Sequence, residues 1–152
     1  MKFKDKIVLV TGSSRGIGRA TALAFAKEGA NVIVNYVKDG ESAGKVVEQI
    51  KGLGRDAIAI QADVAIEADV QNLIKESVIH FRGIDVLVNN AGIVFDIPIF
   101  EKTVEQWERT LKVNLIGTLL CTKYAVPHMK NRNGASILNI SSTNGIGSLS
   151  SE

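Results

Sequence analysis

The feature that most constrains the fold of this chain is a regular alternation between short apolar runs and longer stretches with helical spacing. The apolar runs are rich in Val and Ile and cover residues 6–11, 31–36, 57–61, 85–90 and 136–141. Runs of this kind predict strands that are buried on both faces. Because a helical stretch separates each run from the next, we expect right-handed crossovers and a parallel sheet covered on both sides. The predicted fold class is therefore α/β, a doubly wound parallel sheet.

The helical stretches cover residues 16–28, 41–51, 67–81 and 103–129. In the first, residues at steps of three and four form an apolar stripe, made of Ile17, Ala20, Thr21, Ala24 and Phe25. In the last, Trp107, Leu111, Leu115 and Thr118 share one face. Since no linker, low-complexity run or internal repeat interrupts the pattern, we expect residues 1–152 to form a single domain.

Composition and charge exclude several classes of function. The formal net charge is +2, from 18 basic and 16 acidic residues that do not form blocks, so the chain shows no electrostatic footprint for nucleic acid. No apolar stretch reaches the ~20 residues of a membrane span, and the N-terminal apolar run is too short for a signal peptide. Cys121 is the single cysteine and cannot form an internal disulfide, which fits a reducing cytoplasm. We expect Cys121 to be a buried helix residue and assign no metal site.

The strongest local signal is the sequence "TGSSRGIG" at residues 11–18, between the first strand and the first helix. Gly12, Gly16 and Gly18 would permit a tight turn, close approach of the backbone to a pyrophosphate, and close packing of the helix on the strand. The helix N-terminus would present free N–H groups and a partial positive charge to the phosphates. The alternative is a glycine-rich turn in which Ser13 or Ser14 caps the helix. The position between strand and helix favours dinucleotide binding.

The end of the second strand indicates which dinucleotide would bind. A carboxylate there favours NAD, whereas a cation accommodates the 2′-phosphate of NADP. The critical places are occupied by Asn35, Tyr36 and Val37, and no acid precedes Asp39 at this strand end. Since Arg15 and Lys38 can both reach the same phosphate, the sequence favours NADP over NAD. The alternative is that residues 38–40 simply form a solvated turn.

Two further strand ends carry polar residues. Asp63 follows the third strand, where it would either accept a hydrogen bond from an adenine amino group or cap the next helix; the sequence leaves these alternatives level. Asn89 and Asn90 end the fourth strand as adjacent amides that would tie neighbouring strand ends together. Ala91 and Gly92 would leave room for a flat ring.

Asn114 is a polar residue on or beside the apolar face of the last helix. A buried amide without a hydrogen-bond partner costs about 1–3 kcal/mol. Asn114 therefore either binds something specific or faces solvent at the margin of the stripe, and its position alone does not decide between the two.

The motifs "TGSSRGIG", "ADV", "NNAG", "VNLIGT" and "ILNISS" occur in the order and spacing of the short-chain dehydrogenase/reductase family. The chain resembles this family throughout its length, and within it the bacterial 3-oxoacyl-[acyl-carrier-protein] reductases most, with glucose dehydrogenase-like members close behind. The resemblance implies a Rossmann-like domain, a nicotinamide cofactor, and hydride transfer to a carbonyl or from an alcohol. It also implies a cytoplasmic enzyme of fatty acid biosynthesis, usually a homotetramer. We expect the strand order 3-2-1-4-5.

The resemblance also assigns roles to single residues. The residues that would hold the pyrophosphate and the adenosine phosphate are Gly12, Ser14, Arg15, Gly16, Ile17 and Gly18. Together with Tyr36 and Val37 at the second strand end, Asp63 and Val64 would border the adenine side, and Asn90, Ala91 and Gly92 would lie along the nicotinamide ribose. Asn114 would help a proton relay through water, and Ser142 would donate a hydrogen bond to the substrate oxygen.

The chain departs from the family at the proton donor. The family uses a tyrosine and, four residues later, a lysine, both downstream of the serine, and no such pair follows Ser142 here. Tyr124 lies upstream and is followed by His128 at that spacing, so we interpret both as helix or surface residues, and His80 likewise. We expect a domain truncated before the later strands, with residues 148–152 as a flexible tail.

Two functional classes remain open at this point. In the first, the chain is the N-terminal part of a longer NADP(H)-dependent oxidoreductase. That enzyme would act on a small-molecule or acyl-carrier-bound carbonyl, such as a 3-oxoacyl thioester, or would be a sugar or alcohol dehydrogenase of the same family. The second is a nucleotide-binding module without catalysis. An exposed sheet edge after the fifth strand would be an aggregation liability, which favours the first class.

Overall fold

A computed structural model describes residues 1–142 of the chain. Its strands form one parallel sheet in the order β3-β2-β1-β4-β5, which confirms the predicted fold class and strand order. The strands are β1 Ile7–Val10, β2 Asn31–Tyr36, β3 Ala57–Gln61, β4 Val86–Asn89 and β5 Ser136–Asn139. The α-helices are α1 Gly16–Lys27, α2 Gly40–Gly52, α3 Glu67–Phe81, α4 Val104–Leu111 and α5 Gly117–Ala125.

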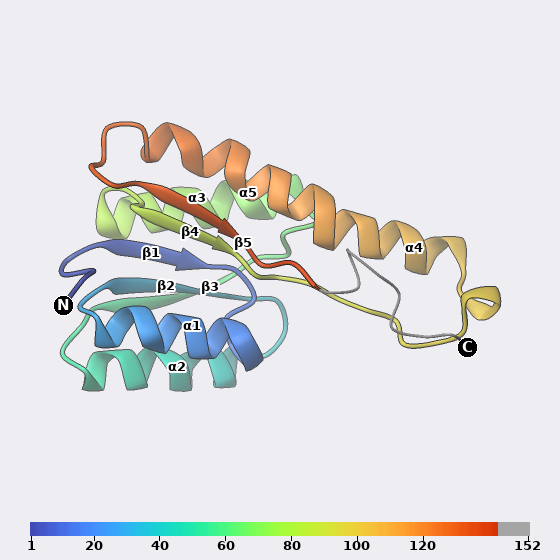
Figure 1. Cartoon of the computed structure of the whole chain (residues 1–152), viewed down its shortest axis with the longest axis horizontal. Helices are drawn as coiled ribbons and strands as arrows, with labels where there is room; N and C mark the ends of the chain where they lie inside the picture. The colour runs from blue at the N-terminus through green and yellow to red at the C-terminus, as the bar shows by residue number, and fades with distance from the viewer. Residues whose placement is uncertain (143–152) are drawn as a thin grey trace.

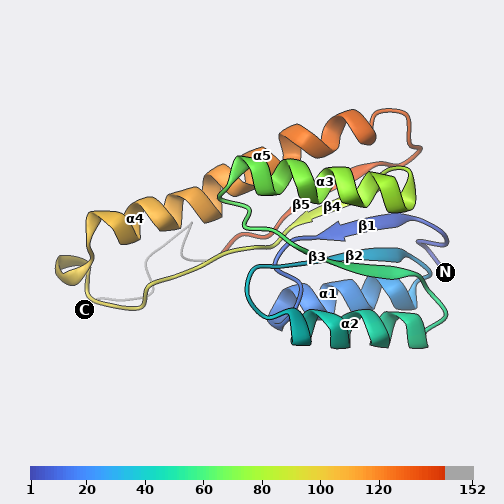
Figure 2. The same cartoon turned by 180° about the vertical axis from the view of Figure 1, so that it is seen from behind.

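The helices cover the sheet in two layers, with α1 and α2 on one face and α3 and α5 on the other (Figure 1; Figure 2 shows the molecule from behind). The alternation of side chains along each strand feeds two separate cores. Val8 and Val10 of β1 pack toward α1 and α2, whereas Ile7 and Leu9 pack toward α3 and α5. Strands β1, β2 and β4 are therefore buried on both faces, as predicted.

The prediction that every strand is buried on both faces is wrong for the two outer strands. All residues of β5 are exposed, and β3 has buried and exposed residues in turn. Both strands lie at the ends of the strand order, and in the part of the chain that the structure describes no further strand pairs with either outer edge. The apolar run of β5 was therefore a correct signal for a strand but not for its burial.

The predicted stripe of α1 is also wrong in detail. Ile17, Ala20 and Ala24 are exposed, and the buried face consists of Gly18, Ala22 and Ala26. Residues without large side chains let the helix backbone lie close to the sheet, so small size rather than hydrophobicity decides which face is inside.

The long helix predicted over residues 103–129 is continuous but not uniform. Thr103 begins it with a capping box, in which its side chain accepts from Gln106 N and the Gln106 side chain accepts from Thr103 N. Between α4 and α5 lies a π-helical turn, Lys112–Ile116, and a 3₁₀ turn, Val126–His128, ends the helix.

The four-residue apolar face predicted on this helix does not enter the core. The large apolar members of that face, Trp107, Leu111 and Leu115, are exposed. The core is reached instead by Val113, Leu120, Cys121 and Ala125. The π turn changes the helical phase, and α4 itself projects beyond the carboxyl edge of the sheet without a buried residue (Figure 1).

Asp85 joins three segments at the amino end of the sheet. Its buried carboxylate accepts from Ile7 N at 2.8 Å and from Arg132 Nε and Nη2 at 2.9 and 3.0 Å, with Lys6 Nζ at 3.5 Å. These bonds hold the turn before β5 against β1 and β4. Within residues 1–142, no helix is both long and apolar enough to cross a membrane.

Candidate functional site

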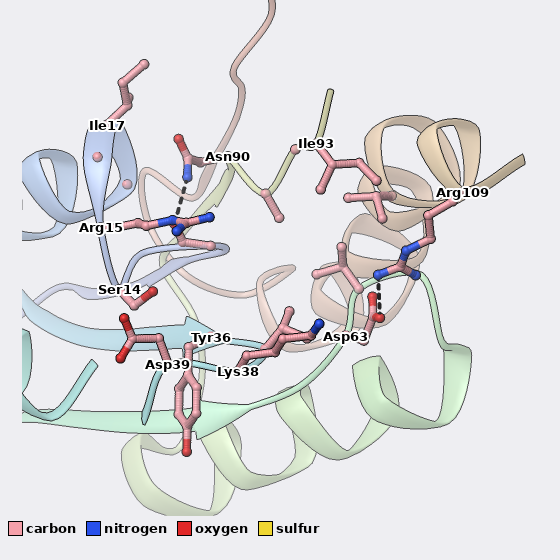
Figure 3. Close-up of a pocket in the computed structure, with 18 of the residues that line it drawn as sticks. Ser14, Arg15, Ile17, Tyr36, Lys38, Asp39, Asp63, Asn90, Ile93 and Arg109 are labelled. Atoms are coloured by element: carbon pink, nitrogen blue, oxygen red, sulfur yellow. Dashed lines mark hydrogen bonds and ion pairs between the residues drawn. The ribbon is translucent and has the colours of Figure 1, made fainter. Parts of the chain in front are cut away.

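A cavity of about 620 Å³ lies at the carboxyl edge of the sheet, where the ends of β1, β2, β3 and β4 converge (Figure 3). All the residues assigned to the dinucleotide from the sequence line it, namely Gly12, Ser14, Arg15, Gly16, Ile17, Gly18, Tyr36, Val37, Asp63, Val64, Asn90, Ala91 and Gly92. The other lining residues are Lys38, Asp39, Ile93, Phe95, Arg109 and Val113. The size is that of a pocket for a small molecule or cofactor.

The glycine turn forms one wall of the cavity in a conformation that requires glycine. Gly12 and Gly16 have φ values of +62° and +57°, in the left-handed region. A Cβ at Gly18 would stand 2.5 Å from Asn90 Nδ2 and 2.5 Å from Gly12 O, and one at Gly12 would stand 2.9 Å from Ala91 Cα. The turn therefore packs backbone against backbone, and α1 approaches the end of β4 more closely than any side chain would allow.

The reading of Ser13 or Ser14 as a helix cap is wrong. The N-cap of α1 is Arg15, and no side chain caps the first turn. Ser13 is buried instead, where its hydroxyl donates to Val10 O at 2.7 Å and accepts from Asn35 N at 3.1 Å. Among residues 1–142, no side chain thus bonds the first N–H groups of α1 at the cavity.

Asn35, one of the residues at the critical places of the second strand end, has a supporting role that the sequence analysis did not predict. Its side chain is fully buried at the end of β2, where Oδ1 accepts from Gly12 N at 3.0 Å and Nδ2 donates to Ala62 O at 3.0 Å. One amide therefore links the glycine turn to the end of β3. The available signal was an amide at the end of a run that is otherwise apolar, because a buried amide needs partners.

The paired amides at the end of β4 tie strand ends together, as predicted. Asn90 Nδ2 donates to Thr11 O at 2.9 Å and to Gly12 O at 3.1 Å, and Asn90 N donates to Thr11 Oγ1 at 3.0 Å. Asn89 Nδ2 donates to Asn139 Oδ1 of β5 at 2.9 Å. The two amides fix β4 to β1 on one side and to β5 on the other.

Two cations lie at the β2 end of the cavity. Arg15 and Lys38 both line it, and Figure 3 shows Asp39 in the same region. The Asp39 carboxylate caps α2 by accepting from Ser42 N at 2.9 Å, and this bonding together with the charge of Arg15 holds the pKa of Asp39 below its usual value. Asp39 is therefore engaged with its own helix.

Asp63 does more than either alternative predicted. Its Oδ1 accepts from Ala65 N at 3.0 Å, which turns the chain before α3, but the N-cap of that helix is Ile66. Its Oδ2 accepts from Arg109 Nη2 of α4 at 2.6 Å (Figure 3). The sequence held no local signal for Arg109, because the pair joins segments far apart in the chain.

Neither residue assigned to catalysis lines the cavity itself. Asn114 lies in the π turn, where its Oδ1 accepts from Ile93 N and its Nδ2 donates to Ile93 O, both at 2.9 Å. It therefore holds a residue of the cavity wall, although Asn114 is exposed. Ser142 is exposed and follows β5, the neighbour of β4 at the same edge.

The cysteine, the tyrosine of the long helix and the two histidines do not line the cavity. Cys121 is buried in α5, and burial raises its pKa to about 12. Tyr124 OH donates to Glu67 Oε1 between α5 and α3, and His80 bonds Asp56 at 3.0 Å in the last turn of α3. His128 is exposed at the end of the long helix. Residues 143–152, which include the tail predicted at 148–152, lie outside the described residues.

Comparisons with known proteins agree with this geometry. A family model described as short chain dehydrogenase matches residues 6–151. The 3-oxoacyl-[acyl-carrier-protein] reductase FabG of Staphylococcus aureus (strain Mu50 / ATCC 700699) is 46% identical over 140 residues, which cover 92% of this chain and 57% of that protein. The 3-oxoacyl-[acyl-carrier-protein] reductase of Synechocystis sp. is 45% identical over 141 residues, with 93% and 57% covered.

A solved structure shows the same fold. It is a short chain dehydrogenase from Burkholderia cenocepacia in complex with NADP, with a TM-score of 0.87 and 40% identity, and the match covers 91% of this chain and 56% of that one. The chain thus spans a little over half the length of these relatives.

Proposed function

This chain belongs to the short-chain dehydrogenase family, and we propose that it binds NADP(H) and serves an oxidoreductase that transfers hydride to a carbonyl, such as that of a 3-oxoacyl thioester. The observation that carries the proposal is the convergence of every residue assigned to the dinucleotide on one cavity at the carboxyl edge of the sheet. In open α/β sheets, this edge is where ligands bind.

The residues at the glycine turn fit a dinucleotide. Gly12 and Gly18 lie where a Cβ would collide with neighbouring backbone, so the turn leaves room for a pyrophosphate against the main chain. In the described part of the chain no side chain caps the N-terminus of α1, and such an end attracts anions. Ser14 and Arg15 would add side-chain donors to the phosphates.

The charges at the end of β2 favour NADP over NAD. Arg15 and Lys38 would receive the 2′-phosphate, and the carboxylate that would instead bind a ribose hydroxyl is missing from Tyr36 and Val37. Asp39, the one late candidate, caps α2 through Ser42. The NADP named for the Burkholderia cenocepacia relative supports the same assignment.

The bound dinucleotide would supply the hydride for reduction of the carbonyl. Negative charge then develops on the substrate oxygen, and Ser142 is proposed to donate a hydrogen bond to it. Asn114 would hold the wall through Ile93 and join a proton relay through water. The Asn114 side-chain amide bonds Ile93 and its main-chain carbonyl accepts from Thr118 Oγ1 at 3.3 Å, so a relay water would use the remaining hydrogen-bonding capacity of these groups.

The proton donor is proposed to be a tyrosine with a lysine four residues later, as the family resemblance implies. Residues 1–152 contain no such pair. The coding sequence after Glu152 tests this directly: a continuation with Tyr-x-x-x-Lys supports the assignment, and a continuation without it contradicts the assignment. The domain formed by residues 1–152 is then the dinucleotide-binding part of the enzyme.

The substrate proposal rests on the two 3-oxoacyl-[acyl-carrier-protein] reductases described above, each about 45% identical to this chain. It includes an acyl-carrier-bound substrate, a place in fatty acid biosynthesis in the cytoplasm, and a homotetramer. The assay is the consumption of NADPH by the full-length gene product with a 3-oxoacyl thioester, beside a sugar as alternative substrate. We expect the thioester to be reduced at the higher kcat/KM, and preference for the sugar would contradict the substrate class.

A matched pair of serine variants tests the role of Ser142. Ser142→Ala should lower kcat by about 100-fold or more, the cost of removing one donor from a developing oxyanion. Ser136→Ala, at the other end of β5, removes a hydroxyl that donates to Gly134 O and should leave kcat unchanged. Equal activity of the two variants would contradict the role of Ser142.

A further inference from the structure

One helix holds two walls of the cavity. Arg109, in α4, binds Asp63 in the segment after β3, and Asn114, in the following π turn, binds Ile93 in the segment after β4. Figure 3 shows the Arg109 guanidinium directed at the Asp63 carboxylate, beside the cavity that both residues line. The distance between the two walls is thus set by a short stretch of a single helix.

Hydrogen bonds of both the side chain and the main chain hold Asp63 in the cavity wall. Its carboxylate accepts from Ala65 N and from Arg109 Nη2, and its main-chain N–H donates to Asp69 Oδ2 at 2.9 Å. The Asp63 side chain is 15% exposed and the Arg109 side chain 39%, so the ion pair is partly withdrawn from water. A charge pair in this setting holds its geometry better than a surface pair.

The same helix also supports the neighbour of Asp63. A Cβ at Gly117 would stand 2.7 Å from Val64 Cγ2, so the helix backbone lies directly against Val64. Val113, which is buried and lines the cavity, comes between these contacts. Arg109, Val113 and Gly117 follow one another at steps of four, and the wider π turn keeps them on one face.

We infer that Arg109 is a positioning residue for the adenine end of the proposed NADP(H) site, where it fixes and neutralises Asp63. This inference rests on the proposed function, which puts the adenine beside Asp63 and Val64. Without the guanidinium, Asp63 would keep its negative charge in a wall that faces a polyanionic ligand and would lose one of its two side-chain bonds. The adenine half of the ligand should then bind more weakly, whereas the nicotinamide half, bound at the end of β4, should not be affected.

The test measures the binding of three probes to the 152-residue chain: NADPH, adenosine 2′,5′-bisphosphate and nicotinamide mononucleotide. Arg109→Gln should weaken NADPH and adenosine 2′,5′-bisphosphate by the same factor, roughly 10- to 100-fold, the cost of one charge-assisted hydrogen bond. Nicotinamide mononucleotide should bind as before. Arg109→Lys, which keeps the charge, should restore part of the loss. Lys112→Gln, in the same helix but outside the cavity, is the matched control and should change no affinity.

A double-mutant cycle separates positioning from general loosening. If Arg109 acts through Asp63, then Arg109→Gln in an Asp63→Asn background should cost less than twofold. Additive losses, an equal loss for both halves of the ligand, or unchanged binding of adenosine 2′,5′-bisphosphate would overturn the inference. If the unmodified chain bound neither NADPH nor the bisphosphate, the proposed function itself would fail and the inference with it.

Discussion

Asn114 and Ile93 are joined by a pair of hydrogen bonds, in which the Asn114 side chain accepts from Ile93 N and donates to Ile93 O, each at 2.9 Å. The amide side chain offers one acceptor and one donor to the Ile93 main chain, as a neighbouring strand would. It ties the segment that follows β4 to the π turn of the long helix, and so turns a residue of the helix into a support for the cavity wall.

Replacing Asn114 with Ala should release this segment. We expect amide exchange at Ile93 N–H to become at least about tenfold faster, because a lost free energy of ~1.4 kcal/mol corresponds to that factor and two bonds are removed. Hydrogen exchange measured by NMR reports this directly. Asn72→Ala, at an exposed site in α3, gains the same helix propensity and is the control. Unchanged exchange at Ile93 would show that the two bonds do not hold the segment.

Gly18 and Gly44 offer a second matched pair. Gly18→Ala should destabilise the fold by about 1–3 kcal/mol, because the new Cβ would meet Asn90 Nδ2 and Gly12 O, each at 2.5 Å, and backbone would have to move. Gly44→Ala, inside α2 with nothing within 4 Å, should stabilise by up to ~1 kcal/mol. Urea unfolding gives both values. A Gly18→Ala variant as stable as Gly44→Ala would contradict the close contact of α1 with the end of β4.

The carboxylate of Asp85 should make the free energy of unfolding depend on pH in the acid range. Burial acts to raise its pKa, but the hydrogen bonds from Arg132 and Ile7 and the charges of Arg132 and Lys6 outweigh it and hold the pKa below its usual value. A lowered pKa in the folded state contributes stability that is present above the unfolded pKa of ~3.9 and is lost as the pH falls through the folded pKa. The unfolding free energy should therefore decrease below about pH 4.

Two variants isolate this contribution in unfolding measurements at neutral pH and at a series of lower pH values. Asp85→Asn should cost about 3 kcal/mol, since it breaks a buried pair and leaves Arg132 without its partner, and should flatten the acid limb of the stability curve. Glu41→Gln, which removes an exposed pair with Lys45, should cost less than ~0.5 kcal/mol. Similar losses from the two variants would rule out a special role for Asp85.

The sheet and the position of the cavity could be predicted from the sequence because their signals are local. Apolar runs mark the strands, and the residues that end them, such as Asn90 and Asp63, meet at one edge in any parallel sheet. The exposure of β5 could not be predicted, because the exposed fraction of an edge strand depends on what packs against that edge. The buried face of α1 was not predicted because Ala22 and Ala26 are only weakly hydrophobic. They are buried because their small side chains let the helix lie close to the sheet.

Contacts between segments far apart in the sequence could not be predicted either. Arg109 binds Asp63 through a long-range pair, and nothing around either residue in the sequence points to the other. The π turn at Lys112–Ile116 was also missed, since it changes the helical phase without a glycine or proline to mark it at its start. These are the features that set the shape of the cavity wall.

Cys121 should be inert in the folded chain. It is 1% exposed, and burial raises its pKa to about 12, so neither access nor thiolate is available near neutral pH. A thiol reagent such as iodoacetamide should label it only after unfolding in urea, as followed by intact mass. Stoichiometric labelling of the folded protein at pH 8 within minutes would contradict its place in the core.

The preference between NADPH and NADH tests the central claim most directly. Titration of the chain with each dinucleotide should give NADPH the tighter binding by at least about tenfold, and Arg15→Ala should remove most of that preference, because a charged hydrogen bond to phosphate contributes ~1.5–3 kcal/mol. Arg19→Ala, one helical turn further along and bonded to Gln49, should keep the preference. NADPH binding no tighter than NADH to the unmodified chain would contradict the account.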